Sequence, residues 1–170
     1  PAYRWTGTDM VVSVGNGRYY NPAYNEVQNL IVNGVVEIVD KYDVDGIHFD
    51  DYFYPTTDES FDSTAYKTYK NNGGTLSLGD FRRQNVTNLV EKVYKAIKYR
   101  NPSVTFGISP QGNNKTNYES QYIDVETIIK KGYIDYICPQ VYYGYNHSTC
   151  PYEQTVKEFN EYVKIADETL

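Results

Sequence analysis

The sequence Val-Asp-Gly-Ile-His-Phe-Asp-Asp-Tyr-Phe-Tyr-Pro, residues 44–55, decides the fold of this chain. Apolar residues recur at helical spacing over residues 24–41, so a helix is predicted to lead into a strand at this point. Side chains alternate along a strand, which places His48 and Asp50 on one face and Asp51 on the other. An unpaired buried carboxylate is unfavourable by several kcal/mol, so we expect both aspartates to reach a polar cleft or to find partners.

Length and charge limit the classes of protein to which this chain can belong. Its 170 residues, 40% of them hydrophobic, are enough for a single domain over residues 1–170 with its own core. The net charge of −6 and the pI near 4.9 argue against nucleic acids and anionic membranes as partners, since both require a basic surface. No apolar run approaches the roughly 18 residues needed to cross a bilayer, so no membrane span is predicted.

Strand and helix patterns alternate along the chain, which is typical of an α/β fold. Strands are predicted over residues 10–14, 46–51, 104–109 and 136–142, with residues 15–22 as a loop. Helices are predicted over residues 24–41, from an N-cap at Asp80 to residue 100, over residues 123–130, and from residue 152 onward. Four strand-loop-helix units in a row predict a parallel sheet with right-handed crossovers. The polar insertion at residues 56–79 is either a functional loop over the strand ends or a surface excursion.

Several strings of sequence occur in the order and spacing that one family shows. They are Tyr-Asn-Pro at residues 20–22, the stretch Tyr-Asp-Val-Asp-Gly-Ile-His-Phe-Asp-Asp-Tyr-Phe-Tyr-Pro at 42–55, Phe-Arg-Arg-Gln-Asn-Val at 81–86, Phe-Gly-Ile-Ser-Pro at 106–110 and Ile-Asp-Tyr-Ile-Cys-Pro-Gln-Val-Tyr at 134–142. Through them, nearly the whole chain resembles the glycosyl hydrolase-like 10 family of bacterial proteins, which have a (β/α)₈ barrel. The resemblance implies a glycoside hydrolase that cleaves O-glycosidic bonds in a bacterial polysaccharide, with peptide-free peptidoglycan strands as one candidate. It also implies a secreted or cell-envelope protein.

A complete barrel of this type needs about 250 residues, so the chain is expected to be a partial (β/α)₈ TIM barrel. The resemblance implies four consecutive βα units with parallel strands, about the third to the sixth. Half a barrel would leave apolar side chains bare on its open face, which predicts a homodimer through that face. It also cannot place groups on both sides of a sugar ring, so we expect the isolated chain to be inactive.

Polar side chains gather where the predicted strands end, and barrel enzymes carry out their chemistry at these ends. Asp50 and Asp51 are the candidate catalytic residues, and His48 is placed to hydrogen-bond Asp50. We expect Asp50, His48, Gln140 and Tyr142 to converge on one cleft. The candidate substrate-binding residues are Arg18, Asn21, His48, Tyr52, Ser109, Gln111, Gln140, Tyr142 and Tyr143.

The strand also resembles, more distantly, the D-x-x-D-x-D-x-E strand of family-18 chitinases. Asp50 then matches the last aspartate, while His48 replaces an aspartate and Tyr52 stands where the acid glutamate is found. A tyrosine with an ordinary pKa of about 10 is a poor general acid, so that mechanism does not carry over. Against the R-x-D strand of family-13 amylases, His48 and Asp50 fall on the arginine and the nucleophile, so both alignments favour Asp50.

Hydrolysis of a glycosidic bond needs one protonated and one ionised carboxyl group across the scissile bond. Asp50 supplies one, and the second is Asp51, Glu119 or a residue in the absent units. Two alternatives stay open: a non-catalytic carbohydrate-binding barrel, which the missing glutamate permits, and a metal-dependent hydrolase that uses Asp50, Asp51 and His48. The second is disfavoured because the chain has only two histidines without ligand spacing, so we expect no metal and no cofactor.

The chain contains two cysteines, Cys138 in a predicted strand and Cys150 in a predicted loop. They form a disulfide if the protein is exported, or they are two independent thiols. Their spacing does not decide between these alternatives.

Overall fold

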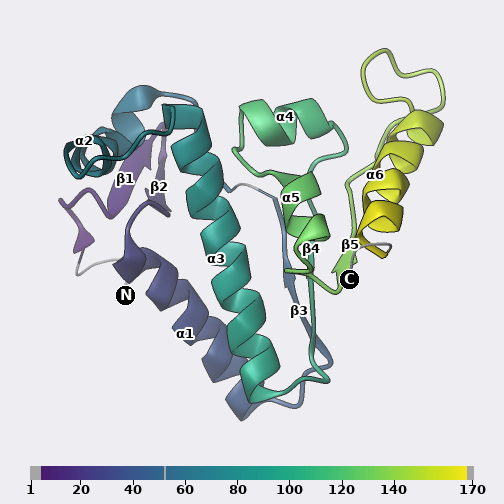
Figure 1. Cartoon of the computed structure of the whole chain (residues 1–170), viewed down its shortest axis with the longest axis horizontal. Coiled ribbons are helices and arrows are strands. Elements are labelled where there is room, and N and C mark those ends of the chain that lie inside the picture. Colours follow the sequence, from purple (N-terminus) through teal and green to yellow (C-terminus); the bar gives the residue numbers. More distant parts are fainter. Residues whose placement is uncertain (1–4, 52, 168–170) are drawn as a thin grey trace.

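A parallel sheet of three short strands forms the middle of the fold (Figure 1). The computed structural model describes residues 5–51 and 53–167. The strands are β3 (Gly46–Phe49), β4 (Thr105–Ile108) and β5 (Tyr136–Ile137), in this order across the sheet. Both pairings are parallel, as predicted for the second, third and fourth strands. Each strand is shorter than predicted, and β5 has only two residues, although an isolated parallel bridge joins Gln111 to Gln140 beyond it.

Helices alternate with these strands and cover one face of the sheet (Figure 1). They are α1 (Asn25–Lys41), α3 (Leu78–Arg100), α4 (Asn114–Glu119), α5 (Val125–Lys130) and α6 (Tyr152–Asp167). The strand side chains Ile47, Phe106 and Ile108 pack among the helices in the hydrophobic core, where Phe106 and Ile108 are fully buried. The α/β class is therefore confirmed, and α4 is a short helix that the sequence pattern did not predict.

The first predicted strand is not part of the parallel sheet. Strand β1 (Val11–Val14) pairs antiparallel with β2 (Gly17–Tyr20) in a separate hairpin, so the prediction of four parallel strands is wrong at this position. Two residues, Gly15 and Asn16, make the turn, and Gly15 has a φ of +55°. Gly-Asn is a typical two-residue hairpin turn, because glycine adopts positive φ without steric cost. Residues 17–20 are thus a strand, although they were predicted to be loop.

The face of the sheet opposite the helices, called the open face here, carries polar side chains. His48, Thr105 and Tyr136 are exposed, whereas Ile47 and Phe106, their neighbours in sequence or register, face the helices. The expectation of an apolar open face is therefore wrong, because strand alternation sends the apolar side chains to the helical side. Apolar surface is found instead beside the edge strands: next to β5, a groove of about 360 Å³ is lined mainly by aliphatic side chains, among them Ile129, Ile134, Ile137 and Val163.

The insertion at residues 56–79 is ordered and carries its own helices. A 3₁₀ helix, η2 (Glu59–Asp62), leads into α2 (Ser63–Asn71), and Phe61 is buried in the core. Helix α3 then begins earlier than predicted: Ser77 is the N-cap and its Oγ accepts a hydrogen bond from the Asp80 backbone N–H at 3.1 Å. The Asp80 carboxylate in turn accepts from the Ser77 hydroxyl at 2.5 Å, so the predicted N-cap lies in the first turn of the helix.

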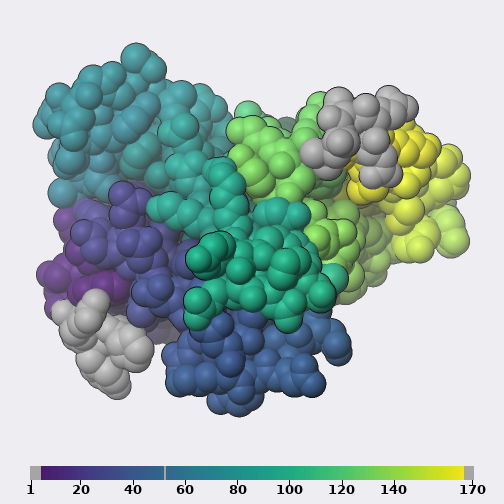
Figure 2. All heavy atoms as spheres, turned by 60° about the horizontal axis from the view of Figure 1, so that its bottom comes forward, coloured from purple at the N-terminus to yellow at the C-terminus, as the bar shows by residue number. Residues whose placement is uncertain are grey.

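Helices α1 and α3 lie side by side and are joined at both ends. Lys92 Nζ donates to Asn25 Oδ1 at 3.0 Å and to Gln28 Oε1 at 2.7 Å near the start of α1. At the C-terminal ends of the two helices, Arg100 forms an ion pair with Asp40. Figure 2 shows this end of the molecule, where the C-terminal end of α3 projects above the loop from α1 into β3. Within residues 5–51 and 53–167, no helix combines the length and the apolar character needed to cross a bilayer.

Candidate functional site

Three predicted strand ends meet at Asp50. Strand β3 ends at Phe49, and Asp50 follows it on the open face with an exposed side chain. Its Oδ1 atom accepts hydrogen bonds from the Asp51 backbone N–H at 3.0 Å and from Gln140 Nε2 at 2.7 Å. Gln140 Nε2 also donates to the Ser109 carbonyl at 3.1 Å, so the segments after β3, β4 and β5 are tied together here. Two donors aimed at one carboxylate oxygen fix the orientation of Asp50.

His48 also lies on the open face, but its hydrogen-bond partner is Tyr136 and not Asp50. His48 Nδ1 is 2.8 Å from the Tyr136 hydroxyl, and the two rings are stacked at 5.8 Å between centroids. Between them in the sheet lies Gly107, where a Cβ atom would be 2.2 Å from the Tyr136 ring. A glycine is therefore required on β4 so that the Tyr136 ring can cross it and reach His48. The expected His48–Asp50 hydrogen bond is absent among the described residues.

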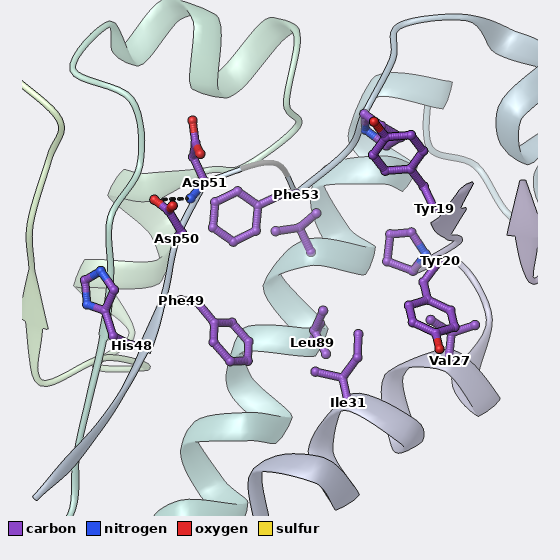
Figure 3. A pocket seen from close by; sticks show the side chains of 13 residues that line it. Tyr19, Tyr20, Val27, Ile31, His48, Phe49, Asp50, Asp51, Phe53 and Leu89 are labelled. Carbon is purple, nitrogen blue, oxygen red and sulfur yellow. Dashed lines mark hydrogen bonds between the residues drawn. The ribbon is translucent and has the colours of Figure 1, made fainter. Parts of the chain in front are cut away.

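A cavity of about 370 Å³ opens beside both aspartates (Figure 3). Asp50, Asp51 and His48 line one side of it, and Tyr19 and Tyr20 of the hairpin line the opposite side. Aliphatic and aromatic side chains of α1, α3 and the β3 region line the rest: Val27, Ile31, Phe49, Phe53, Val86 and Leu89. Asp51 was expected on the opposite face from Asp50, but β3 ends before both residues, so strand alternation no longer sets their directions.

The remaining residues of the predicted site are placed differently. Asn21 is fully buried, and its amide donates to the carbonyls of Asp9 and Phe61 while its Oδ1 accepts from Ala23 N–H, so it holds loops together and is not brought to the cavity. Arg18 is exposed on β2, opposite Ser13. Glu119 is exposed on α4, 3.9 Å from Lys115, and does not line the cavity beside Asp50.

Two further groups complete the predicted set. Ser109 is 7% exposed and contacts Gln140 through its carbonyl, while the Gln111 backbone is held by Asn117, whose Nδ2 donates to the Gln111 carbonyl at 2.8 Å. Tyr142 and Tyr143 lie in the loop after β5, where they are 80% and 44% exposed. Of the four residues expected to converge, Asp50 and Gln140 make contact, while Tyr142 is on this projecting loop. Tyr52 lies outside the described residues.

Behind the site, a buried ion pair holds the segment that follows Asp51. The side chains of Arg82 and Asp62 are both 0% exposed, 2.6 Å apart, and Arg82 also donates to the carbonyls of Thr57 and Asp58. The guanidinium lies between the rings of Tyr54 and Tyr122, at 5.3 Å and 4.8 Å. Burial acts to lower the pKa of Arg82, but the hydrogen bonds and charge of Asp62 outweigh it and raise this pKa. Burial also raises the pKa of the Tyr54 hydroxyl.

Neither a disulfide nor a metal site is found in the part of the chain that the structure describes. Cys138 is exposed and Cys150 is buried, and both are free thiols, so the disulfide alternative is not realised. Cys150 Sγ lies 3.2 Å from Thr155 Oγ1. In residues 5–51 and 53–167, no group of three or more His, Cys, Asp or Glu side chains is arranged to hold a metal ion.

Three tyrosines at this site were not predicted from the sequence: Tyr19 and Tyr20, which line the cavity, and Tyr136, which contacts His48. The Gly15-Asn16 dipeptide was a usable signal for the first two, because it marks the hairpin that carries them. Gly107 was a signal for the third, since a glycine inside a strand often marks the close approach of a neighbouring group.

Comparison with known proteins gives a consistent assignment. The sequence profile described as Glycosyl hydrolase-like 10 matches residues 4–168. Glycosyl hydrolase YngK of Bacillus subtilis (strain 168) is 36% identical over 174 residues, which cover 92% of this chain and 34% of that protein. Glycosyl hydrolase DigH of Escherichia coli (strain K12) is 34% identical over 172 residues, which cover 92% of this chain and 39% of that protein. The chain thus spans between a third and two fifths of the length of these curated relatives, and it belongs to the glycosyl hydrolase-like 10 family.

Proposed function

We propose that this chain is part of the catalytic region of a glycoside hydrolase, with Asp50 as its key carboxylate. The observation that carries the proposal is the placement of Asp50: it is exposed, held by Gln140 and the Asp51 backbone N–H, and lies where parallel strands end. Barrel enzymes bind substrate and perform chemistry at this end of the sheet. Membership of the glycosyl hydrolase-like 10 family supports the same reaction class.

Asp51 is the proposed second carboxylate. Hydrolysis requires an acid and an ionised group on the two sides of the glycosidic bond, and Asp50 and Asp51 line the same cavity. The cavity also offers the hairpin residues Tyr19 and Tyr20, whose rings present flat apolar faces and hydroxyl tips to a sugar. His48, Gln140 and Arg18 are proposed to contact the substrate around this pair of carboxylates.

Membership of the family also supports two more detailed proposals, one on the class of substrate and one on the location of the protein. We propose a bacterial polysaccharide, with peptide-free glycan strands of peptidoglycan as the first substrate to test, and therefore action in the cell envelope or outside the cell. We also propose that the three parallel strands are consecutive units of a larger (β/α)₈ barrel. The apolar groove beside β5 supports this extension of the sheet, because edge strands of parallel sheets are normally covered.

The decisive experiment measures release of reducing ends from peptide-free glycan strands. Because the chain spans only part of its relatives, it is tested in a chimera in which residues 4–168 replace the matching segment of YngK. In an active chimera, Asp50→Asn should lower the rate by about a thousandfold, since one acid–base group contributes roughly 10²–10⁴ in rate. Asp51→Asn should act similarly, whereas Glu119→Gln, on the exposed surface of α4, should leave the rate unchanged.

Two results would redirect the proposal. An active chimera that keeps its rate after Asp50→Asn would remove Asp50 from the catalytic group. A chain that binds the glycan but never yields product, in the chimera or alone, would favour the non-catalytic carbohydrate-binding alternative. The 170-residue chain alone is expected to be inactive, because without the rest of the barrel it does not hold the sugar in the correct position against Asp50 and Asp51.

Self-association of the isolated chain stays a prediction. The surface expected to drive it is now the groove beside β5 and not the open face. A homodimer through the open face would bury the polar side chains of His48, Thr105 and Tyr136, with little hydrophobic gain. The aliphatic groove beside β5 is the stronger driving force for contact between copies. Sedimentation velocity at micromolar concentration measures the association, and Val163→Glu in this groove should weaken it, whereas Thr105→Glu on the open face should not.

A further inference from the structure

Residues 139–152, which lead from β5 to α6 and include the first residue of α6, expose an unusual number of tyrosine rings. We call this segment the tyrosine loop. Tyr142 is 80% exposed and Tyr145 is 71% exposed, and Tyr143 and Tyr152 follow at 44% and 42%. In Figure 1 the loop stands away from the helical layers, at the upper right beside α6. Exposed aromatic side chains gathered in one short segment of a folded domain are typical of a binding site.

Contacts within the loop hold three of these rings in place, those of Tyr143, Tyr145 and Tyr152. Tyr143 stacks on His147 at 4.2 Å between ring centroids, and His147 Nδ1 accepts a hydrogen bond from the Cys150 backbone N–H at 3.2 Å. Tyr145 packs edge-on against Tyr152 at 5.5 Å. The backbone N–H groups of His147 and Tyr152 both donate to the Gly144 carbonyl, which closes the loop. A ligand that binds here therefore meets rings whose conformational entropy is already reduced.

The composition of the loop selects among ligands. Residues 139–152 contain no Lys, Arg, Asp or Glu, and the polar groups among them are amides, hydroxyls, a thiol and one imidazole. Nucleic acids require cations to neutralise phosphates, so this surface does not suit them. A sugar ring offers an apolar C–H face that stacks on a tyrosine and a rim of hydroxyls that hydrogen-bond to uncharged groups. An extended glycan fits this combination.

The loop is continuous with the site at Asp50. Gln140 lies at its start and donates to Asp50 Oδ1 at 2.7 Å, so a chain of sugars placed at Asp50 can continue over the rings that follow. We propose that the tyrosine loop binds sugar units beyond those held at Asp50, and that the substrate is accordingly a polymeric glycan and not a short oligosaccharide. This inference rests on the proposed function for the class of ligand, but binding at the loop does not require that the chain cleave it.

The test measures binding by the 170-residue chain carrying Asp50→Asn, which removes the proposed catalytic carboxylate. The probes are peptide-free glycan strands prepared from peptidoglycan, in a sedimentation assay, and the disaccharide chitobiose, by calorimetry. Tyr142→Ala/Tyr145→Ala should weaken binding of the strands by roughly tenfold or more, from the loss of two stacking contacts. Tyr142→Phe/Tyr145→Phe should keep most of the affinity because the rings remain. Affinity for chitobiose should be at least tenfold lower than for the strands, and the alanine variant should not change it.

A matched control is available at the far end of the molecule. Tyr99, near the C-terminal end of α3, is 86% exposed, and Tyr99→Ala should leave binding of the strands unchanged. Equal loss in the Tyr99→Ala and Tyr142→Ala/Tyr145→Ala variants, no loss in the latter, or absence of strand binding by the parent chain would each overturn the inference. So would tyrosine-dependent binding of single-stranded DNA without binding of glycan. None of these readouts depends on cleavage, so failure of the proposed hydrolase activity is recognised separately, in the chimera.

Discussion

Two polar clusters in this chain differ in how completely their hydrogen bonds are satisfied. In the first, Arg82 and Asp62 have fully buried side chains, and each guanidinium nitrogen of Arg82 donates to Asp62 or to a backbone carbonyl. In the second, Asp50 is exposed, and among the described residues only its Oδ1 atom has hydrogen-bond partners. Both clusters lie near the carboxyl ends of the strands, so position alone does not separate their roles.

The two clusters differ in the number of unpaired polar atoms that could bind a ligand. A buried charge must be fully paired, because desolvation is more costly than any single contact can offset. Arg82 and Asp62 meet this requirement because they bond to each other, and Arg82 also donates to the carbonyls of Thr57 and Asp58. No guanidinium nitrogen of Arg82 is then available to bind a substrate. Asp50 keeps an exposed carboxylate oxygen in an orientation fixed by its neighbours. Saturation indicates a structural role for the first cluster, whereas the Oδ2 atom of Asp50, which is unpaired among the described residues, is compatible with the catalytic role proposed for it.

The largest effect on folding is expected from breaking the buried pair. Arg82→Met leaves the Asp62 carboxylate buried without its partner, which should lower the free energy of unfolding by about 3–5 kcal/mol. Urea denaturation followed by circular dichroism measures this change. Arg82→Met/Asp62→Leu should recover part of the loss, because it removes the unpaired charge and fills the space with apolar groups.

The same measurement on Asp50→Asn sharpens the contrast. An exposed carboxylate that is not needed for folding should change the free energy of unfolding by no more than about 0.5 kcal/mol. If Asp50→Asn were as destabilising as Arg82→Met, the two clusters would have the same structural role, and the distinction drawn from hydrogen-bond saturation would fail.

An effect smaller than that of Arg82→Met is expected on the open face, where Tyr136 crosses Gly107. In Gly107→Ala the new Cβ would lie 2.2 Å from the Tyr136 ring, so the ring must move away from His48, at a cost of roughly 1–3 kcal/mol. Urea denaturation measures the loss of stability. Gly107→Ala/Tyr136→Ala should be more stable than the Gly107→Ala variant, because the clash is then absent, and no such rescue would mean that the glycine is needed for another reason.

Local patterns were sufficient to predict much of the fold. Helices α1 and α6 have nearly the predicted bounds, since their apolar residues recur at helical spacing over many turns. The strands β3 and β4 lie where short apolar runs end in polar residues. The hairpin of β1 and β2 was missed because Gly15-Asn16 was predicted to begin a longer loop over residues 15–22, and β5 was predicted too long because the apolar run continues past the point where its pairing stops.

The site could be predicted only in part, for a physical reason. Asp50 was singled out as a candidate because a polar residue at the end of a buried strand is unusual in local sequence. The contacts that define its surroundings join residues far apart in the chain: Gln140 is 90 positions from Asp50, and Tyr136 is 88 positions from His48. Asn21 was misassigned for the same reason, because its partners in the buried loops are set by tertiary packing and not by its neighbours in sequence.

The buried cluster also predicts how stability depends on alkaline pH. Burial, followed by the charge of Asp62, raises the pKa of the Tyr54 hydroxyl, so the folded state keeps a proton that the unfolded chain releases near pH 10. Its contribution to stability is therefore fully present below about pH 10 and is lost as the pH rises further, by at most about 1.4 kcal/mol per pH unit. Tyr54→Phe should flatten the decline of the free energy of unfolding above pH 10. An unchanged slope would place the alkaline sensitivity elsewhere in the chain.

The smallest effect is expected at the exposed counterpart of the buried pair. Arg100 and Asp40 are the same two residue types as Arg82 and Asp62, and they join the ends of α3 and α1 at the surface. The hydrogen bond from Arg100 lowers the pKa of Asp40, so the pair stabilises the fold above the ordinary aspartate pKa and loses this contribution as the pH falls. Arg100→Gln should shift the urea midpoint slightly at neutral pH and low salt, and not at all in about 1 M salt, where exposed charges are screened. The loss in Arg82→Met should persist in the same salt, because water and ions do not reach a buried pair. If both variants responded equally to salt, burial would not be what separates the two arginine–aspartate pairs.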